Sequence, residues 1–176
     1  MPVLSPSKIG ALLFLAVPVF AAEQRTVNSD SVATFHREFR RLTAGPRYVA
    51  PLTSLLCTTP SKGLLDTEQK ATGPHTRAWV HVYANDAAAG TIAQKSPPFP
   101  VGSAIVKEKL AGDFTVAEIG GMIKRAPGYD SANGDWEFFF RSSTGDFQSG
   151  KLANCIECHN GAGRDHVFSA WQISSK

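Results

Sequence analysis

Two cysteines and a histidine stand together near the C-terminal end of the chain, in the run Cys155-Ile156-Glu157-Cys158-His159. Two thiols at this spacing can add to the two vinyl groups of a haem, and the histidine that follows them then lies under the iron. The run therefore predicts one covalently attached haem c, bound through Cys155 and Cys158, with His159 as the proximal iron ligand.

Half of a zinc site is the alternative interpretation of the same run. Zinc would need two further ligands, and the sequence contains no second C-x-x-C. Cys57 and His166 could complete such a site, although at no standard spacing. The spacing therefore favours haem over zinc.

The N-terminus has the pattern of a secretory signal peptide. Lys8 is the only charged residue before Glu23, and an apolar run at 9–17 leads to the small-x-small triplet Val19-Phe20-Ala21. This run is too short for a spanning helix. We expect a signal peptide at 1–21 and a mature domain at 22–176, with an uncleaved membrane anchor as the alternative. Because c-type haem is normally attached outside the cytoplasm, the signal predicts a periplasmic protein with no membrane span after cleavage.

The mature chain would have about 155 residues, which suits a single domain with one core. Its formal charge falls from +3 to +2 when Lys8 is removed. No basic stripe interleaved with aromatic residues is present, so nucleic acid is not an expected partner. Cys57 is the odd cysteine, and its neighbours Leu55 and Leu56 favour a buried thiol over one that pairs between chains.

The sequence pattern predicts both helices and strands. Ser29 or Ser31 could cap a helix that places Phe35, Phe39 and Leu42 on one face and ends at Gly45-Pro46. Alternation and turn residues predict strands at 77–83, 101–110, 114–124 and 135–141. Between them lies a short helix capped by Asp86, and Gly120-Gly121 is expected to be a bulge or a close approach of two strands. A last helix after Gly150 should contain the cysteines, and the tail at 165–171 should pack back on it.

The position of the motif also bears on the iron. Only 17 residues follow His159, and none of them is methionine. Met122, the only methionine after the signal peptide, lies on an expected strand. We therefore expect a five-coordinate iron with an open face for a small molecule. One of four other histidines could instead close that face and leave a simple electron carrier: His36, His75, His81 or His166.

Several runs, in order, resemble the cytochrome P460 family, which includes the β-type cytochromes c′. They cover about residues 75 to 171 and read Val82-Tyr83-Ala84-Asn85-Asp86, Phe99-Pro100-Val101-Gly102-Ser103-Ala104-Ile105-Val106-Lys107-Glu108, Gly121-Met122-Ile123-Lys124-Arg125-Ala126-Pro127-Gly128-Tyr129, Gly134-Asp135-Trp136-Glu137, the cysteine motif, and Asp165-His166-Val167-Phe168 with Trp171.

The resemblance implies an α+β fold, in which a small antiparallel sheet packs with helices and a C-terminal helix carries the haem, and it implies a homodimer. It also implies one of two functions. P460 enzymes oxidise hydroxylamine towards nitrogen oxides and carry a covalent link from a lysine to the porphyrin edge. The β-type cytochromes c′ lack this link and bind nitric oxide. A periplasmic redox partner would accompany the enzymatic function.

Two residues match the catalytic parts that the resemblance implies. Lys107 stands at the position of the cross-linking lysine, although it shares a strand face with Lys109, and paired lysines are typical of a solvated face. Glu118 is the candidate distal base that would accept protons from hydroxylamine. For the gas-binding alternative, Phe99 and Phe114 are candidate caps over the iron, with core packing as the other interpretation.

Overall fold

The computed structural model describes residues 28–49, 62–63 and 78–168. The expected signal peptide, Cys57, His75 and Trp171 lie outside these ranges. Within them, no helix is both long and apolar enough to cross a lipid bilayer.

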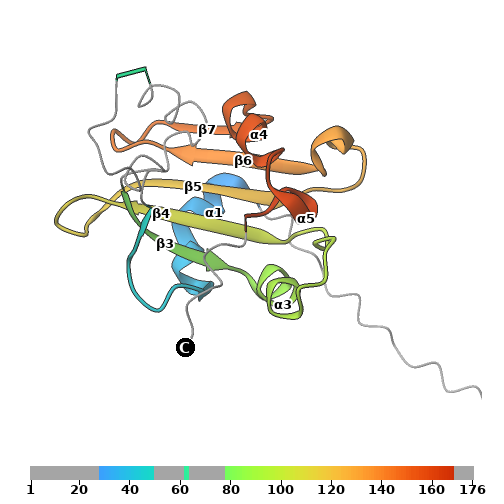
Figure 1. Ribbon diagram of the computed structural model, residues 1–176, viewed down its shortest axis with the longest axis horizontal. Helices are drawn as coiled ribbons and strands as arrows, with labels where there is room; N and C mark the ends of the chain where they lie inside the picture. The colour runs from blue at the N-terminus through green and yellow to red at the C-terminus, as the bar shows by residue number, and fades with distance from the viewer. Residues whose placement is uncertain (1–27, 50–61, 64–77, 169–176) are drawn as a thin grey trace, which may run out of the picture.

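The described strands form one antiparallel sheet in the order β1-β3-β4-β5-β6-β7, with β2 also paired to β3. Figure 1 shows β3 to β7 side by side in this order. From β3 onward each strand pairs with the next one along the chain, so the sheet is a meander. The strands are β1 (Arg40–Arg41), β2 (Arg47–Val49), β3 (Ala78–Ala84), β4 (Ala104–Leu110), β5 (Val116–Lys124), β6 (Trp136–Arg141) and β7 (Phe147–Gly150).

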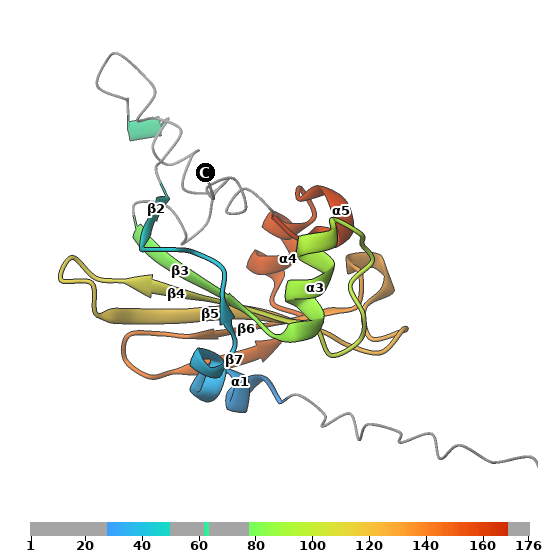
Figure 2. The same ribbon diagram turned by 90° about the horizontal axis from the view of Figure 1, so that it is seen from below.

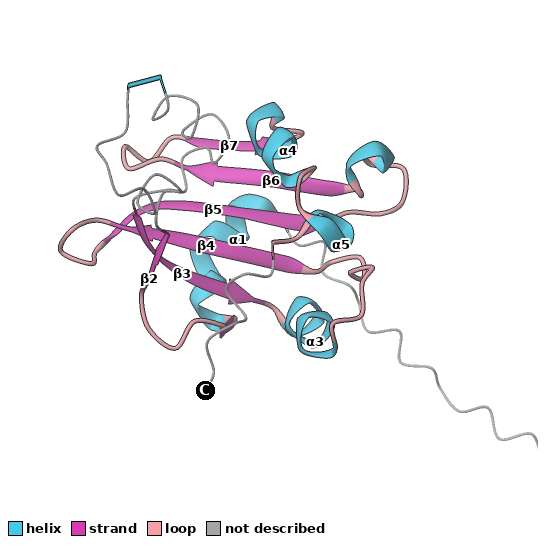
Figure 3. Ribbon diagram, viewed as in Figure 1, coloured by secondary structure: helices cyan, strands magenta, loops and turns pink. Residues whose placement is uncertain are grey.

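Helices cover both faces of this sheet, as Figures 2 and 3 show. Helix α1 (Ser29–Phe35), followed by the 3-10 turn η1 (His36–Glu38), lies on one face. Helices α3 (Asp86–Gln94), α4 (Ala153–His159) and α5 (Gly163–His166) lie on the other. A further 3-10 turn, η4 (Ser131–Asn133), joins β5 to β6. The fold is therefore α+β with a small antiparallel sheet, as expected.

The two faces have separate hydrophobic cores because side chains alternate along each strand. Val82, Ile105 and Met122 belong to the core under α3 and α4. Tyr83 and Val106, each next to one of these along the chain, belong to the core under α1. Along β4, residues an even number of positions from Ile105 therefore face the core under α3 and α4, and residues an even number of positions from Val106 face the core under α1.

The expected N-terminal helix is shorter than its apolar period suggests. It ends at Phe35, and after η1 the backbone of Phe39 is extended, with φ −73° and ψ 162°. Arg40 and Arg41 then pair with β3. The prediction of a helix to Gly45-Pro46 was wrong because an edge-strand pairing, remote in sequence, takes over the same residues.

The expected strands are present with shifted ends. Residues 101–103 form a turn before β4, and β5 begins at Val116. The Ala-rich helix is capped by Asn85, whose side chain accepts from the Ala88 N–H, and not by Asp86. Asn85 also accepts from Ala104 N and donates to the Gly102 carbonyl, so it ties this helix to the start of β4.

A buried carboxylate joins α1 to the sheet. Glu108 on β4 is 2 % exposed and accepts from His36 Nε2 at 2.9 Å, Arg37 Nε at 2.8 Å and the Tyr83 hydroxyl at 3.0 Å. Burial alone would raise the pKa of Glu108, but these hydrogen bonds lower it by more and hold it below its usual value. The network fastens the N-terminal segment to the central strand.

Replacing Glu108 by alanine should lower the free energy of unfolding by about 3 kcal/mol, because buried partners lose their acceptor. Glu118→Ala, which breaks a more exposed pair with Lys109, should cost less than about 1 kcal/mol. Because the folded pKa of Glu108 is depressed, its stabilisation is present above the unfolded pKa of about 4.3 and is lost as pH falls through the folded value. Urea unfolding at several pH values measures both effects, and equal losses for the two variants would contradict this account.

Gly121 is the expected close approach between strands. A Cβ there would collide with the Phe139 ring and stand 2.8 Å from the Ile105 carbonyl oxygen. At Gly120 the nearest atoms to a Cβ lie 3.8 Å away. Only Gly121 is therefore required by packing.

Gly121→Ala should destabilise the protein by about 2 kcal/mol through overpacking. Gly120→Ala should leave the free energy of unfolding unchanged or raise it by up to about 1 kcal/mol. Thermal unfolding of the two variants side by side tests the assignment of faces, which fails if the neighbouring substitutions cost the same.

Candidate functional site

The cysteine motif lies on the short helix α4, as expected. Spacings of three and four residues place Cys155, Cys158 and His159 along one side of this helix. Cys155 and Ile156 pack against the core of the α3 face, whereas Glu157 is exposed. The helix thus presents both thiols and the imidazole on its protein side.

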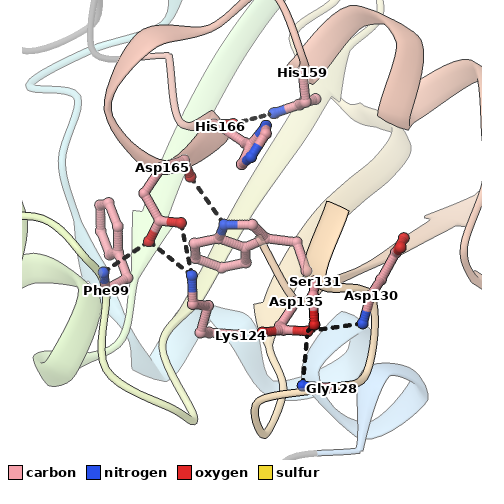
Figure 4. A network of polar contacts seen from close by, with 10 residues as sticks. Phe99, Lys124, Gly128, Asp130, Ser131, Asp135, His159, Asp165 and His166 are labelled. Atoms are coloured by element: carbon pink, nitrogen blue, oxygen red, sulfur yellow. Dashed lines mark hydrogen bonds and ion pairs between the residues drawn. The ribbon is translucent and has the colours of Figure 1, made fainter. Parts of the chain in front are cut away.

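The ring of His159 has a fixed tautomer. Its Nδ1 lies 2.7 Å from the His166 carbonyl oxygen, and since a carbonyl can only accept, Nδ1 carries the proton (Figure 4). Nε2 is then left with a lone pair. Burial lowers the pKa of His159, which favours the neutral ring. Phe138 and Phe168 flank it, with ring centroids 5.0 and 5.3 Å from that of His159.

Lys107 lies on the same face of the sheet as this helix. It lies two residues after Ile105 on β4, so its side chain points to the same face. Ile105 belongs to the core against which Cys155 and Ile156 pack. Burial lowers the pKa of Lys107 to about 8, while the nearby Cys158 and Cys155 act in the opposite direction. The two cysteines would carry no charge as thioethers, so their opposing influence would then vanish. Lys107 is therefore not the solvated lysine that pairing with Lys109 suggested.

One of the two strand positions beside Lys107 has no side chain. Gly120 on β5 is its direct partner in the ladder, and Phe140 on β6 is the partner of Gly120. Gly150 on β7 faces Phe138 in the same way. On this face of the sheet, Gly120 and Gly150 therefore each lie next to a phenylalanine.

The thiol of Cys155 is held in its neutral form. Burial raises its pKa to about 11, with a further rise from Cys158 and an opposing influence from Lys107. Neither Cys155 nor Cys158 forms a disulfide bond with another cysteine in the described part of the chain. A neutral thiol has the form that a thioether link to a vinyl group consumes.

Glu118 also faces this side of the sheet. It pairs with Lys109 in the β4–β5 ladder, and its Oε2 accepts from Lys109 Nζ at 2.9 Å. The strand period places it two residues from Gly120, on the face of Lys107. The structure thus brings Lys107 and Glu118 to one face, with Lys109 engaged by the carboxylate.

His36 and His81, two of the alternative iron ligands, lie on the face of the sheet opposite the cysteine helix. His36 binds Glu108 and His81 lies near Thr43 Oγ1, both on the α1 face. His166 meets His159 through its backbone carbonyl, not its ring. The sheet therefore separates His36 and His81 from the cysteine helix.

The two candidate phenylalanine caps have other contacts. Phe99 is 7 % exposed and packs on Trp136 in the core, with ring centroids 5.5 Å apart. Phe114 is exposed in the β4–β5 hairpin and packs on Trp79. Trp79 points to the α1 face, because it lies four residues before Tyr83 on β3. Phe99 is therefore a core residue, and Phe114 lies on the α1 face, away from His159.

The zinc interpretation gains no ligands from the structure. Among the residues that the structure describes, no three His, Cys, Asp or Glu side chains cluster as a metal site. His166 offers His159 a carbonyl oxygen, and Cys57 lies outside the described ranges.

Sequence reasoning missed how the tail is fastened. Asp165 accepts from Lys124 Nζ at 2.6 and 2.8 Å, and the Asp165 carbonyl accepts from Trp136 Nε1 at 2.9 Å. The only signal for this was the expectation that the tail packs back on the motif.

Comparison of the sequence with protein-family models and with curated proteins finds no match.

Lys107 should titrate near pH 8 in haem-free protein, well below an ordinary lysine, because burial disfavours its charged form. The amine is then protonated below that pH and neutral above it. Lysine side-chain NMR over a pH series, with Lys107→Arg for assignment and Lys109 as the internal comparison, measures this. A midpoint near 10.5 would contradict a Lys107 pKa lowered by desolvation.

Proposed function

We propose that this chain is a periplasmic monohaem c-type cytochrome of the P460 family with a homodimeric, P460-like fold. In this proposal haem c is attached at Cys155 and Cys158, and His159 is the proximal ligand. The distal side of the iron is open and acts on small nitrogen species, oxidising hydroxylamine towards nitrogen oxides. Electrons pass to a periplasmic redox partner.

The residues of the motif fit a haem on two observations. His159 Nδ1 donates its proton to the His166 carbonyl, which leaves the Nε2 lone pair to bind a metal. Histidines that ligate metals usually donate their other ring N–H in this way. The thiols of Cys155 and Cys158 stand on the same side of α4, and Cys155 packs against the core on the face of Lys107. When bound, the haem iron would supply the redox centre.

The position of Lys107 is the observation that carries the enzymatic proposal. A covalent link through Nζ requires an uncharged amine with a lone pair, held against the macrocycle edge. Lys107 lies on the face of the cysteine helix, and burial lowers its pKa to about 8. Replacing one N–H by an N–C bond at a C–H edge is a two-electron oxidation, for which an oxidant of the peroxide class would be the acceptor.

Glu118 is the proposed proton acceptor. Hydroxylamine oxidation releases protons, and a carboxylate on the same face as Lys107 could receive them. Its ion pair with Lys109, however, already occupies one oxygen. This pairing favours a second candidate function, in which the protein is a β-type cytochrome c′ that binds nitric oxide without turnover.

The electron-carrier alternative has weaker support. It requires a sixth protein ligand, and His36 and His81 lie across the sheet from His159. Rapid binding of nitric oxide or cyanide to the purified protein would accord with an open iron site.

The ferrous optical spectrum of Lys107→Ala, compared with wild type, tests the enzymatic proposal. We expect the wild-type protein to show a strongly red-shifted, broadened main band and Lys107→Ala an ordinary high-spin c-haem spectrum. Lys109→Ala is the matched control, because it removes the other lysine of the same strand face, and it should keep the wild-type spectrum.

Each contrary result has a distinct meaning. An ordinary high-spin spectrum in wild type would reject the cross-link and favour nitric oxide binding. A sharp low-spin spectrum would reject both functions and leave an electron carrier.

A further inference from the structure

The backbone carbonyl that orients His159 belongs to α5, whose residues form a left-handed turn and not a regular α-helix. Arg164, Asp165 and His166 all have positive φ, at 56°, 61° and 61°. Side chains with a Cβ rarely adopt this left-handed region, so three such residues in succession are strained unless the surroundings hold them. The turn carries the acceptor of the His159 Nδ1 proton at its last residue.

Asp165 is the centre of the contacts that hold this turn (Figure 4). Its carboxylate accepts two bonds from Lys124 Nζ, at 2.6 and 2.8 Å, and one from Phe99 N at 2.8 Å. Its carbonyl accepts from the indole N–H of Trp136, which is fully buried. Lys124 and Asp165 are each 11 % exposed, so water screens their attraction poorly.

Two of these partners, Lys124 and Trp136, come from the sheet. Lys124 is the last residue of β5 and Trp136 the first of β6, and the two are paired in the ladder. Lys124 Nζ also lies 5.0 Å from the centroid of the Trp136 ring. On the other side of the turn, Gly134 leaves room for His166, because a Cβ there would stand 2.6 Å from His166 Cδ2. The junction of β5 and β6 thus lies against the turn that carries the His166 carbonyl.

We propose that the Lys124–Asp165 ion pair positions the proximal histidine, by locking the left-handed turn whose carbonyl accepts the His159 Nδ1 proton. The inference rests on the proposed function, since His159 is taken as the iron ligand. A hydrogen bond at Nδ1 makes the imidazole a stronger donor to a metal. The pair therefore acts through His159 on the iron, without touching it.

Val167 offers an alternative explanation for the position of the His166 carbonyl. It is buried in the core next to this turn and could hold the carbonyl by packing alone. Under that alternative, loss of the ion pair would cost stability without changing His159. The two explanations differ in what the iron reports.

The test is resonance Raman spectroscopy of the ferrous, haem-loaded protein in two variants, Lys124→Met and the milder Asp165→Asn. Both should lower the frequency of the iron–histidine stretch and raise the reduction potential, because His159 loses its oriented acceptor. Lys124→Arg keeps a cation at the site and should recover much of the wild-type frequency.

Arg125→Met is the matched control. Arg125 follows Lys124 in the chain and forms a comparable pair with Glu137, 2.6 Å between Nε and Oε2, but Glu137 has the parity of the opposite face. This variant should keep the wild-type stretch. Thermal unfolding of all variants shows whether stability losses alone account for any change.

The outcomes separate the two proposals. A covalent haem in every variant, with an unchanged stretch in Lys124→Met and Asp165→Asn, would overturn this inference alone and assign the turn to Val167. A change of equal size in Arg125→Met would also overturn it. Absence of covalent haem from the wild-type protein would overturn the proposed function and this inference together.

Discussion

The alternation of side chains along β4 is the constraint on which both halves of the molecule depend. Glu108 points to the α1 face, where His36, Arg37 and Tyr83 converge on its carboxylate. Lys107, one residue earlier, points to the face of the cysteine helix. Because a slip of one residue would exchange the two, the register of β4 fixes a buried anion on one side and a partly buried amine on the other. Stability and proposed chemistry therefore share one strand.

The C-terminal segment depends on the same sheet through its other end. Helix α4 is short, and its motif side chains gain their orientation from contacts outside it. The His166 carbonyl fixes the His159 tautomer, and the pair of Lys124 with Asp165 ties that carbonyl to the junction of β5 and β6. A histidine held in this way is prepared to ligate a metal before any metal arrives.

Local patterns predicted the elements that local physics controls. The alternation around Val82 and Phe138 indicated strands, and the close approach at Gly121 followed from adjacent glycines. The helix through Phe39 was wrong because Arg40 and Arg41 pair with a strand more than forty positions away in sequence. The contacts around His166 could not be predicted for a related reason. The group that accepts the His159 proton is a backbone carbonyl, and the Lys124–Asp165 ion pair joins residues 41 apart. The haem, the periplasmic location and the resemblance to the P460 family stay predictions.

Covalent attachment of one haem is the claim on which the functional account stands. Intact-mass measurement of the mature protein, produced by export together with c-type maturation machinery, tests it directly. We predict the mass of the chain from residue 22 plus one haem, with both thioether links lost when Cys155 and Cys158 are replaced by alanine. A mature chain at its bare polypeptide mass, or with zinc in place of iron, would contradict it.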